Sequence, residues 1–508
     1  MILSLQQEAV VQWVQEGTGH LNIIARAGTG KTTTLIEITK VMKGDVYLGA
    51  YNKAIADEIS ARLPKRFGGP RVQASTLHSA GMKAWRAAYP HCTVDGRKLG
   101  RIVNDLFTGP TQWKREVYGG FVRKLVSFAK QWGFGFIKDA EDLSNWEELM
   151  DHFGVYPERA AKLEEALEYS QQVFQQSLDA CPEVIDFDDM LLAPLVFHTP
   201  VTQYDWVLID EAQDTNPVRR ELALKMLKKT GRFVAVGDPG QAIYGFTGAD
   251  AASLDHIKKQ LGSKELPLTV TYRCPTKIVK LANTWVPDLE AVPGAPEGEV
   301  IYLPVEEFNP AKTGDNKAAI LCRNVAPLVG IANDCLIKQV PFSFECADIK
   351  DDLLRILSKW KDRDMAGIKS GLQDWKEKEM AFWAARQKWS QVDKIEDRAR
   401  TLHILIEQVD GVGGRDVQAV ERHINRLLID RQTYGSKPGG SFLTITTIHR
   451  SKGREWDTVY LVGRDRLQPS KWARMPWELE QEKNLCYVGV TRAKKRLVEI
   501  NLGEEDKR

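Results

Sequence analysis

The chain contains a glycine-rich turn, ARAGTGKTT, that begins at the end of the apolar run Leu21–Ala25. Glycines at two positions let backbone N–H groups face a phosphate, and the start of a following helix favours negative charge. Lys31 adds a positive charge beside the same phosphates. The pattern is that of a phosphate-binding loop in which Ala25 stands at the place of the usual first glycine. We expect nucleotide phosphates to be held by Ala27, Gly28, Thr29, Gly30, Lys31, Thr32 and Thr33.

Two adjacent carboxylates follow a second apolar run, Trp206–Ile209. Asp210 is placed to hold Mg²⁺ together with the hydroxyl of Thr32, because this hard cation prefers oxygen ligands. Glu211 is a candidate to orient or deprotonate the water that attacks the γ-phosphate. A solvated acidic loop is the competing interpretation, but such loops rarely follow four apolar residues directly. Together the two motifs predict hydrolysis of a nucleoside triphosphate with Mg²⁺ as cofactor.

Several short β-branched runs end in turns of this kind, which is typical of buried parallel strands joined by helices. In open α/β sheets, ligands bind where strands end and loops begin. Two long stretches, from about Met82 to Pro182 and from Asp348 to Arg431, have instead a helical pattern rich in Trp and charged residues. The expected strands are Leu21–Ala25, Val46–Ala50, Trp206–Ile209, Arg232–Val236, Ala319–Cys322, Phe442–Thr446 and Thr458–Val462.

Composition excludes several classes of protein. A length of 508 residues suits three or four compact units. The 70 Lys and Arg against 68 Asp and Glu give a weak overall field, so attraction to a polyanion must come from local patches. No apolar run is long enough to span a bilayer and the N-terminus has no leader pattern, so we expect a cytoplasmic protein with no membrane partner. The seven scattered cysteines include no C-x-x-C pair and predict neither a zinc site nor a disulfide framework.

The order of the motifs resembles superfamily 1A DNA helicases of the UvrD/Rep/PcrA group, and the resemblance covers nearly the whole chain. The phrase YNKAIADEI leans towards the branch that includes the F-box DNA helicases, although no F-box precedes Gln6. The matching segments are Gln6, Ala50–Ala54, Ser75–His78, Asp186–Leu191, Val236–Tyr244, Thr271–Arg273, Ala319–Arg323, Thr447–Trp456 and Tyr487–Lys494.

The resemblance implies an α/β fold of two RecA-like P-loop motor domains with parallel sheets, each interrupted by a mainly helical insertion. The first motor domain, 1A, is expected at 1–81 and 183–270, with insertion 1B at 82–182. The second, 2A, is expected at 271–347 and 432–508, with a reduced insertion 2B at 348–431. Only a short tail, Lys494–Arg508, is expected after the last motif, so a nuclease fused to the chain is not expected.

The resemblance also assigns nucleotide contacts beyond the phosphate-binding loop. Gln6 is expected to read adenine, and Gln241 to sense the γ-phosphate. Arg273 and Arg492 are expected to neutralise charge on that phosphate, which phosphoryl transfer requires. Glu455 is expected to help hold the nucleotide; a solvated turn glutamate is the competing interpretation.

Single-stranded DNA is gripped by phosphate contacts and aromatic stacking, which are tolerant of sequence. Tyr244 and Phe246 could equally be core residues when each is taken alone. Two departures from the family pattern concern these contacts: Thr247 replaces a frequent arginine, and the aromatic usual at Ala50 is displaced by one position. The residues expected to bind DNA are Tyr51, Asn52, Thr76, His78, Tyr244, Phe246 and His449.

The implied activity is ATP-driven movement along single-stranded DNA in the 3′ to 5′ direction, with cleft closure between the motor domains and unwinding at single/double-strand junctions. Translocation is the firmer expectation, because insertion 2B is short. Roles in repair, recombination or replication fit this family, in a bacterial or phage context or in a nucleus; a protein partner is not identified. Two alternatives stay open: a nucleotide-regulated DNA-binding subunit of a repair or defence complex, and an RNA-directed helicase.

Overall fold

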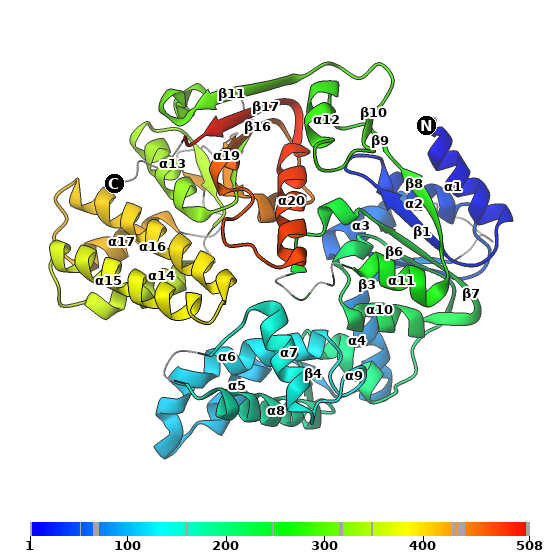
Figure 1. Cartoon of the computed structure of the whole chain (residues 1–508). Helices are drawn as coiled ribbons and strands as arrows, with labels where there is room; N and C mark the ends of the chain where they lie inside the picture. Colours follow the sequence, from blue (N-terminus) through cyan, green and yellow to red (C-terminus); the bar gives the residue numbers. More distant parts are fainter. Residues whose placement is uncertain are drawn as a thin grey trace. The chain divides into compact units, whose positions relative to one another are not determined.

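The computed structural model describes residues 3–50, 52–63, 71–157, 161–245, 248, 250, 252–313, 318–346, 349–428, 433–434 and 442–503. The chain divides into two compact units, Met1–Thr269 and Val270–Arg508. Each unit is an α/β fold built on a mainly parallel sheet, and several of the strands, among them β1, β6, β16 and β17, are labelled in Figure 1.

The first unit contains a six-stranded parallel sheet with the strand order β3-β2-β6-β7-β1-β8. The strand before the glycine-rich loop, β1, therefore lies between two strands that come much later in the chain. The strands of this unit are β1 Leu21–Ala25, β2 Val46–Ala50, β3 Val72–Thr76, β4 Thr93–Val94, β5 Val184–Ile185, β6 Tyr204–Ile209, β7 Leu227–Gly237 and β8 Lys264–Leu268.

Helices cover both faces of this sheet, because its central strands alternate their apolar side chains between two cores. Trp206 and Leu208 face the core formed with α1 and α2, whereas Val207 and Ile209 face a larger core. This larger core continues into the helices of the first insertion, so insertion and sheet are packed as one body. The helices are α1 Leu5–Glu16, α2 Lys31–Thr39, α3 Lys53–Arg62, α4 Leu77–Ala88, α5 Lys98–Leu106, α6 Gln112–Gln131, α7 Leu143–Phe153, α8 Leu163–Asp179, α9 Asp189–Val196, α10 Pro217–Lys225 and α11 Ser253–Leu261.

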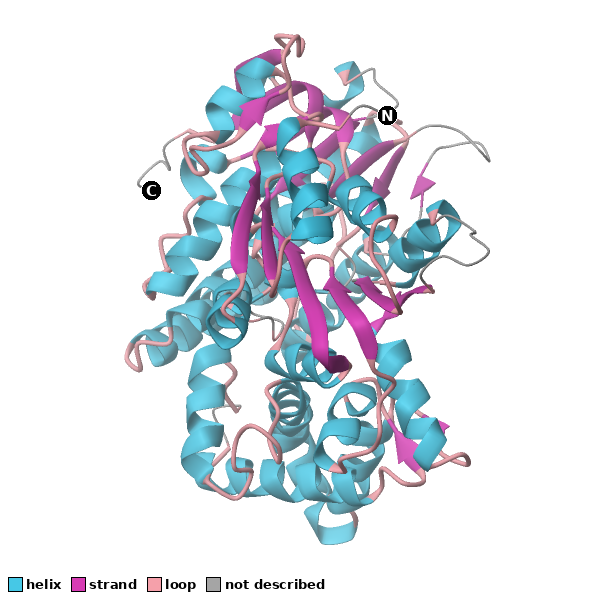
Figure 2. Cartoon of the chain, turned by 90° about the vertical axis from the view of Figure 1, so that its right-hand side faces the viewer, coloured by secondary structure: helices cyan, strands magenta, loops and turns pink. Residues whose placement is uncertain are grey.

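The second unit contains a seven-stranded sheet with the strand order β11-β17-β16-β12-β15-β13-β14. Among the described strands of this sheet, only β13 and β14 pair antiparallel. Figure 2 shows the strands, in magenta, with helices packed beside them. The strands are β9 Val270–Thr271, β10 Glu290–Ala291, β11 Glu299–Pro304, β12 Ala318–Cys322, β13 Phe342–Phe344, β14 Thr433–Tyr434, β15 Leu443–Thr447, β16 Trp456–Val462 and β17 Ala493–Asn501.

A group of four helices, α14 to α17, forms the insertion of the second unit and is yellow to orange in Figure 1. Within it, α15 and α16 run as a helical hairpin, and α16 also packs on α13. The helices of this unit are α12 Thr276–Ala282, α13 Val325–Ile337, α14 Lys350–Leu357, α15 Met365–Ala384, α16 Trp389–Asp410, α17 Val417–Leu427, α18 Ile448–Ser451, α19 Arg464–Leu467 and α20 Pro476–Val490.

The predicted fold class is confirmed: both sheets are parallel apart from one pair of strands, and each is interrupted by helices. Each of the seven predicted strands is present, with ends that differ by a few residues. The short segment expected after the last motif includes a strand that was not predicted, since Ala493–Asn501 is β17 and pairs with β11 and β16. The exact division into four subdomains stays a prediction; helix α4, for example, crosses the expected boundary between 81 and 82.

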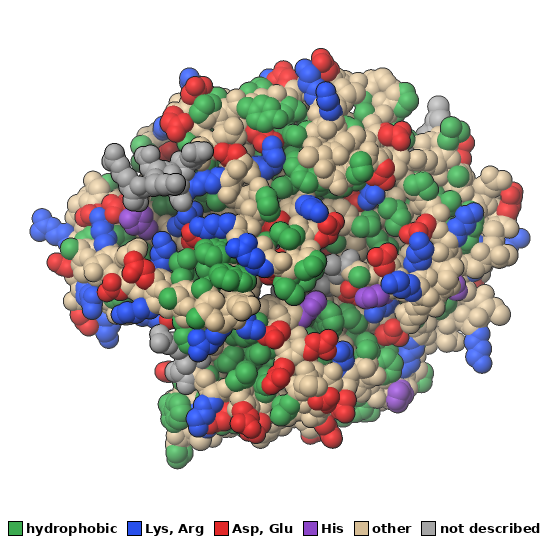
Figure 3. Space-filling model, viewed as in Figure 1, with side chains coloured by type: hydrophobic (Ala, Val, Ile, Leu, Met, Phe, Trp, Pro, Cys, Tyr) green, Lys and Arg blue, Asp and Glu red, His purple; other side chains and the backbone are tan. Residues whose placement is uncertain are grey.

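Charged side chains of both signs are interspersed over the face shown in Figure 3, where blue and red atoms alternate with apolar ones. This agrees with the formal net charge of +2. Among the described helices, none combines the length and the apolar character that a bilayer crossing requires.

Candidate active site

The glycine-rich loop joins the end of β1 to the start of α2. Gly28 and Gly30 have φ angles of 73° and 81°, in the left-handed region that only glycine adopts without cost. A Cβ on Gly30 would also lie 2.9 Å from Nε2 of Gln7. Lys31 is the first residue of α2, so its side chain and the free N–H groups of the helix start belong to the same turn. This is the backbone geometry of a phosphate cradle.

Two neighbouring glutamines of α1 form hydrogen bonds with residues in and around this loop. Gln6 donates from Nε2 to the hydroxyl of Thr269 at 2.8 Å and accepts from its backbone N–H at 2.8 Å. Gln7 is buried and donates to Oγ1 of Thr34 at 3.2 Å and to the carbonyl of Thr29 at 3.5 Å. Gln7 was not predicted, although its capping box with Ser4 is visible in the sequence. The adenine contact of Gln6 stays a prediction.

Lys31 lies against the carboxylates that follow β6. Its Nζ atom is 2.8 Å from Oε1 of Glu211. Burial alone would lower the pKa of Lys31, but Glu211, Asp210 and Asp238 outweigh it and raise that pKa. Burial and the neighbouring Glu211 raise the pKa of Asp210 to about 7, against the smaller opposing effect of Lys31. The adjacent carboxylates of Asp210 and Glu211 disfavour each other's charged form, so a cation bound between them would be stabilised.

A chain of hydrogen bonds connects Glu211 to the loop that follows β7. Gln213 donates to Oε2 of Glu211 at 2.6 Å, and its Oε1 accepts from the backbone N–H of Asp238 at 3.0 Å. Asp238 in turn accepts from Nε2 of Gln241 at 2.7 Å and forms an ion pair with Arg26 at 3.1 Å. The three expected motifs of the nucleotide site are thus brought together in one network, through a residue, Gln213, whose role the sequence reading missed.

The donor set of this site fits Mg²⁺. Thr32, in the first turn of α2, offers a hydroxyl, and Asp210 offers a buried carboxylate whose Oδ1 accepts from the backbone N–H of Glu211. Oxygen ligands of this kind, few in number, leave room for the waters and phosphate oxygens that Mg²⁺ requires. The combination is consistent with the expected metal ligands, which stay a prediction.

A cavity of about 20 Å³ is lined in part by Asp210 and Glu211 and, beside them, by His78, Thr215 and Arg219. This volume holds about one water molecule. Burial, with a smaller effect of Arg219, lowers the pKa of His78 to about 4. His78 is therefore neutral near pH 7 and close to the candidate catalytic groups.

The other residues expected to contact DNA in the first unit lie at element ends. Asn52 caps α3 by accepting from the N–H of Ile55, and Thr76 caps α4 by accepting from the N–H of Ser79. Tyr244 is half-buried. Tyr51 and Phe246, and the substitution at Thr247, lie outside the described residues. These DNA contacts stay predictions.

In the second unit, the structure brings Arg273, Glu455 and Arg492 to one end of the sheet. Nε of Arg273 donates to Oε2 of Glu455 at 2.5 Å, and its Nη1 lies 3.5 Å from the carbonyl of Thr491. Arg492 is 1% exposed and donates to the carbonyl of Arg454 at 3.2 Å. The proposed roles of these three residues at a γ-phosphate stay predictions.

His449 lies in α18, near the end of β12. Burial lowers the pKa of His449 to about 3, and the neighbouring Arg323 contributes to the shift. Arg323 is itself held by both carboxylate oxygens of Glu482 at 2.9 Å and by Asp393 at 2.9 Å. These ion pairs join β12, α20 and the inserted helix α16, and they were not predicted.

A parallel sheet with a phosphate cradle at the end of one strand and paired carboxylates at the end of another defines a P-loop protein of the α/β class. The UvrD/REP helicase N-terminal domain matches residues 4–262, and the UvrD-like helicase C-terminal domain matches residues 354–502. The first match alone covers half of the chain, and the chain belongs to the UvrD/Rep helicase family, as the resemblance predicted.

Relatives of known name include F-box DNA helicase protein 1 of Schizosaccharomyces pombe, which is 24% identical over 98% of this chain and 57% of its own length. DNA helicase II of Haemophilus influenzae is 23% identical over 64% of this chain and 60% of its own length. ATP-dependent DNA helicase UvrD2 of Mycobacterium tuberculosis is 24% identical over 97% of this chain and 77% of its own length. The chain thus spans less than two thirds of the length of the first two relatives.

Proposed function

We propose that this protein is an ATP-dependent single-stranded DNA translocase and DNA helicase. The observation that carries the proposal is the network that joins Lys31 of the phosphate cradle, through Glu211, Gln213 and Asp238, to Gln241. A protein that merely bound nucleotide would not require a carboxylate beside the lysine and a glutamine connected to both. The names of the relatives, all DNA helicases, support the same activity.

In this mechanism Lys31 and the glycine-loop N–H groups hold the β- and γ-phosphates, and Glu211 orients and deprotonates the attacking water. Mg²⁺, held by Thr32 and Asp210, would supply charge neutralisation on the phosphates. Gln241 responds to the γ-phosphate through Asp238. The remaining nucleotide contacts that we propose are Gln6, Ala27, Gly28, Thr29, Gly30, Thr33, Arg273, Glu455 and Arg492.

We further propose that travel is 3′ to 5′ and that the substrate is a single strand or its junction with a duplex. Neutral histidines and capping hydroxyls suit phosphate contacts that donate one hydrogen bond each, and aromatic rings suit stacking on bases. The proposed DNA contacts are Tyr51, Asn52, Thr76, His78, Tyr244, Phe246 and His449. Segments 82–182 and 348–431 are proposed as inserted subdomains 1B and 2B.

The test compares the wild type with Glu211→Gln and Lys31→Ala. Glu211→Gln removes the base but keeps the fold, so ATPase kcat should fall about 100-fold or more while ATP binding is retained. Lys31→Ala should abolish both hydrolysis and displacement of a strand from tailed duplexes. Displacement that persists in Lys31→Ala would overturn the motor mechanism.

Tailed duplexes of both polarities test direction, and displacement only from a 5′ tail would overturn the proposed 3′ to 5′ travel. ATPase stimulation by single-stranded DNA and by RNA of the same sequence and length, at matched salt, tests the substrate class. Stronger stimulation by RNA would make this an RNA-directed enzyme. ATP hydrolysis without displacement of either duplex would restrict the function to translocation.

A further inference from the structure

The last turn of α6, in the first insertion, is fixed to two segments that follow far along the chain. Ser127 donates to Oδ2 of Asp188 at 2.5 Å, and Nζ of Lys130 lies 2.6 Å from Asp186. At the end of the helix, Nε1 of Trp132 donates to the carbonyl of Gly248 at 3.2 Å. The C-terminal end of α6 therefore connects the insertion to the loop that follows Gln241.

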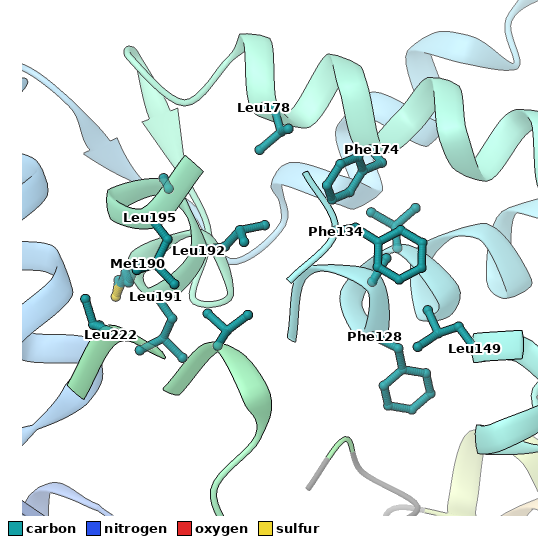
Figure 4. Packing of buried hydrophobic residues seen from close by; sticks show 14 of the residues in the cluster. Phe128, Phe134, Leu149, Phe174, Leu178, Met190, Leu191, Leu192, Leu195 and Leu222 are labelled. Carbon is teal, nitrogen blue, oxygen red and sulfur yellow. The ribbon is translucent and has the colours of Figure 1, made fainter. Parts of the chain in front are cut away.

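The indole of Trp132 is itself held firmly within the insertion. Its ring lies 4.7 Å from that of His152 and packs edge-on against Phe153 at 5.5 Å. Phe153 stacks in turn on Phe128 of α6 at 4.1 Å. Figure 4 shows Phe128 in the same cluster of apolar side chains as residues of α9, such as Leu191. The hydrogen bond to Gly248 thus originates from a rigid donor.

Gly248 has a backbone conformation and close surroundings that favour glycine at the position of this contact. Its φ angle is 106°, and a Cβ at this position would lie 2.2 Å from Oε1 of Gln131. Two residues later, Asp250 is bound by Arg220 at 2.9 Å and by His256 at 2.6 Å. The loop after Gln241 is therefore fixed at one point to the insertion and at a second point to α10 and α11.

This loop begins within the candidate nucleotide network, since Gln241 is bonded to Asp238. It continues through Tyr244, one of the proposed DNA contacts, before it reaches Gly248. A change at Gln241 can therefore reach Trp132 along seven residues of chain and one hydrogen bond, and a movement of the insertion can reach Gln241 by the same route.

We propose that Trp132 is a positioning residue that couples the first insertion to the loop Gln241–Asp250, so that DNA bound by the protein accelerates ATP hydrolysis. This inference rests on the proposed function, because it assumes that nucleotide and DNA are bound as described above. Trp132 is not among the residues proposed to contact nucleotide or DNA. Through its hydrogen bond to Gly248 it limits the movement of the chain that follows Gln241.

The variant Trp132→Phe keeps an aromatic ring but removes the indole N–H. Trp146→Phe is the matched control: Trp146 lies in the same insertion and donates its Nε1 to the carbonyl of Ala140 at 2.9 Å, away from the loop. Gly248→Ala disturbs the contact from the opposite side. Hydrogen exchange of the peptide 242–252 and ATPase rates with and without single-stranded DNA are measured for all three variants and the wild type.

Loss of one hydrogen bond should accelerate exchange of this peptide about fivefold in Trp132→Phe, and not in Trp146→Phe. The DNA-stimulated kcat should fall by about the same factor, while the DNA-free rate stays within about twofold of the wild type. Gly248→Ala should reproduce the loss of stimulation.

Equal stimulation in Trp132→Phe and Trp146→Phe would overturn the coupling, and so would faster exchange without loss of stimulation. A wild-type protein whose ATPase does not respond to DNA would contradict the proposed function itself. The two failures are therefore distinguishable in the same set of measurements.

Discussion

Glu211 is a non-glycine residue with a φ angle of 51°, in a backbone region that costs about 1 kcal/mol or more for such residues. The cost is offset locally, since Glu211 is bound by Lys31 and by Gln213. The turn places the carboxylate immediately after Asp210 at the end of a buried strand. Strain of this size is typical of residues whose orientation matters for chemistry.

His449 gives a prediction of pH dependence. Its pKa is lowered to about 3 in the folded protein, chiefly by burial, against about 6.5 when unfolded. Between these values the unfolded state binds more protons, so the folded state loses stability as the pH falls below about 6.5. Replacement by Asn removes this dependence.

We expect the free energy of unfolding of the wild type to fall by about 2 kcal/mol more than that of His449→Asn between pH 8 and pH 5. Urea unfolding at both pH values measures it. Replacement of the exposed His91 by Asn should leave the wild-type pH dependence in place. An identical pH response in wild type and His449→Asn would show that the pKa of His449 is the same in the folded and unfolded states, which would contradict the lowered value.

Residues of the candidate site differ in how far the sequence predicted them. Two groups of site residues are recognisable from the sequence because each is continuous along the chain. These are the glycine-rich loop with Lys31, and the pair Asp210 and Glu211. Gln213 and Trp132 were missed, because each acts through a partner that only the fold brings near. No local pattern distinguishes such a glutamine or tryptophan from a surface or core residue.

At the scale of elements, buried ion pairs fix each insertion to the rest of its unit. In the first unit, Lys130 of α6 lies 2.6 Å from both Asp186 and Asp189, and Lys98 of α5 lies 2.7 Å from Asp189. Burial alone would lower the pKa of Lys130, but the two aspartates outweigh it and raise that pKa. These groups hold each other charged in the interior, so removal of one leaves the others uncompensated.

Lys130→Met should therefore destabilise the first unit by about 3–5 kcal/mol. The control Lys138→Ala, which removes an exposed pair with Glu148 at 2.7 Å in the same insertion, should cost about 1 kcal/mol or less. Thermal or urea unfolding, with hydrogen exchange to identify the unit that opens, measures both. A methionine variant as stable as the control would mean that the buried charges contribute no net stability.

The strands that the sequence predicted are the apolar central ones. Strand β8, with the sequence KELPL, was not predicted because Lys, Glu and Pro are unusual in strands. It lies at the edge of the sheet, where the missing N–H of proline is tolerated. β17 begins with AKKR and was taken as part of a tail, yet it is paired on both sides. The charged residues at the start of β17 do not by themselves predict a strand; the pairing with β11 and β16 makes it one.

At the scale of the whole molecule, all seven cysteines are free and buried. Burial raises the pKa of Cys181, Cys322, Cys335 and Cys486 to about 12. At pH 8 only about one in 10⁴ of such thiols is ionised, and the thiolate is the reactive form. Cysteine reactivity should therefore report unfolding of both units.

We expect a thiol reagent such as DTNB to label less than about one thiol per native chain within minutes at pH 8, and all seven in urea. ATP that stabilises the native protein should slow the labelling further. Rapid labelling of several thiols in the native state would contradict the burial described here.

The position of β1 in its sheet has a consequence for how the protein is made. Leu21 pairs with Val234 on one side and with Lys264 on the other. A ribosome that adds about 5–20 residues per second needs roughly 10–50 s after β1 has been synthesised to deliver both neighbours. Until then the strands on both sides of β1 are missing, so the nucleotide site around the glycine-rich loop is incomplete. A nascent chain at this stage cannot bind the nucleotide that would stabilise it. Strand β1 is thus synthesised well before the strands that complete its pairing.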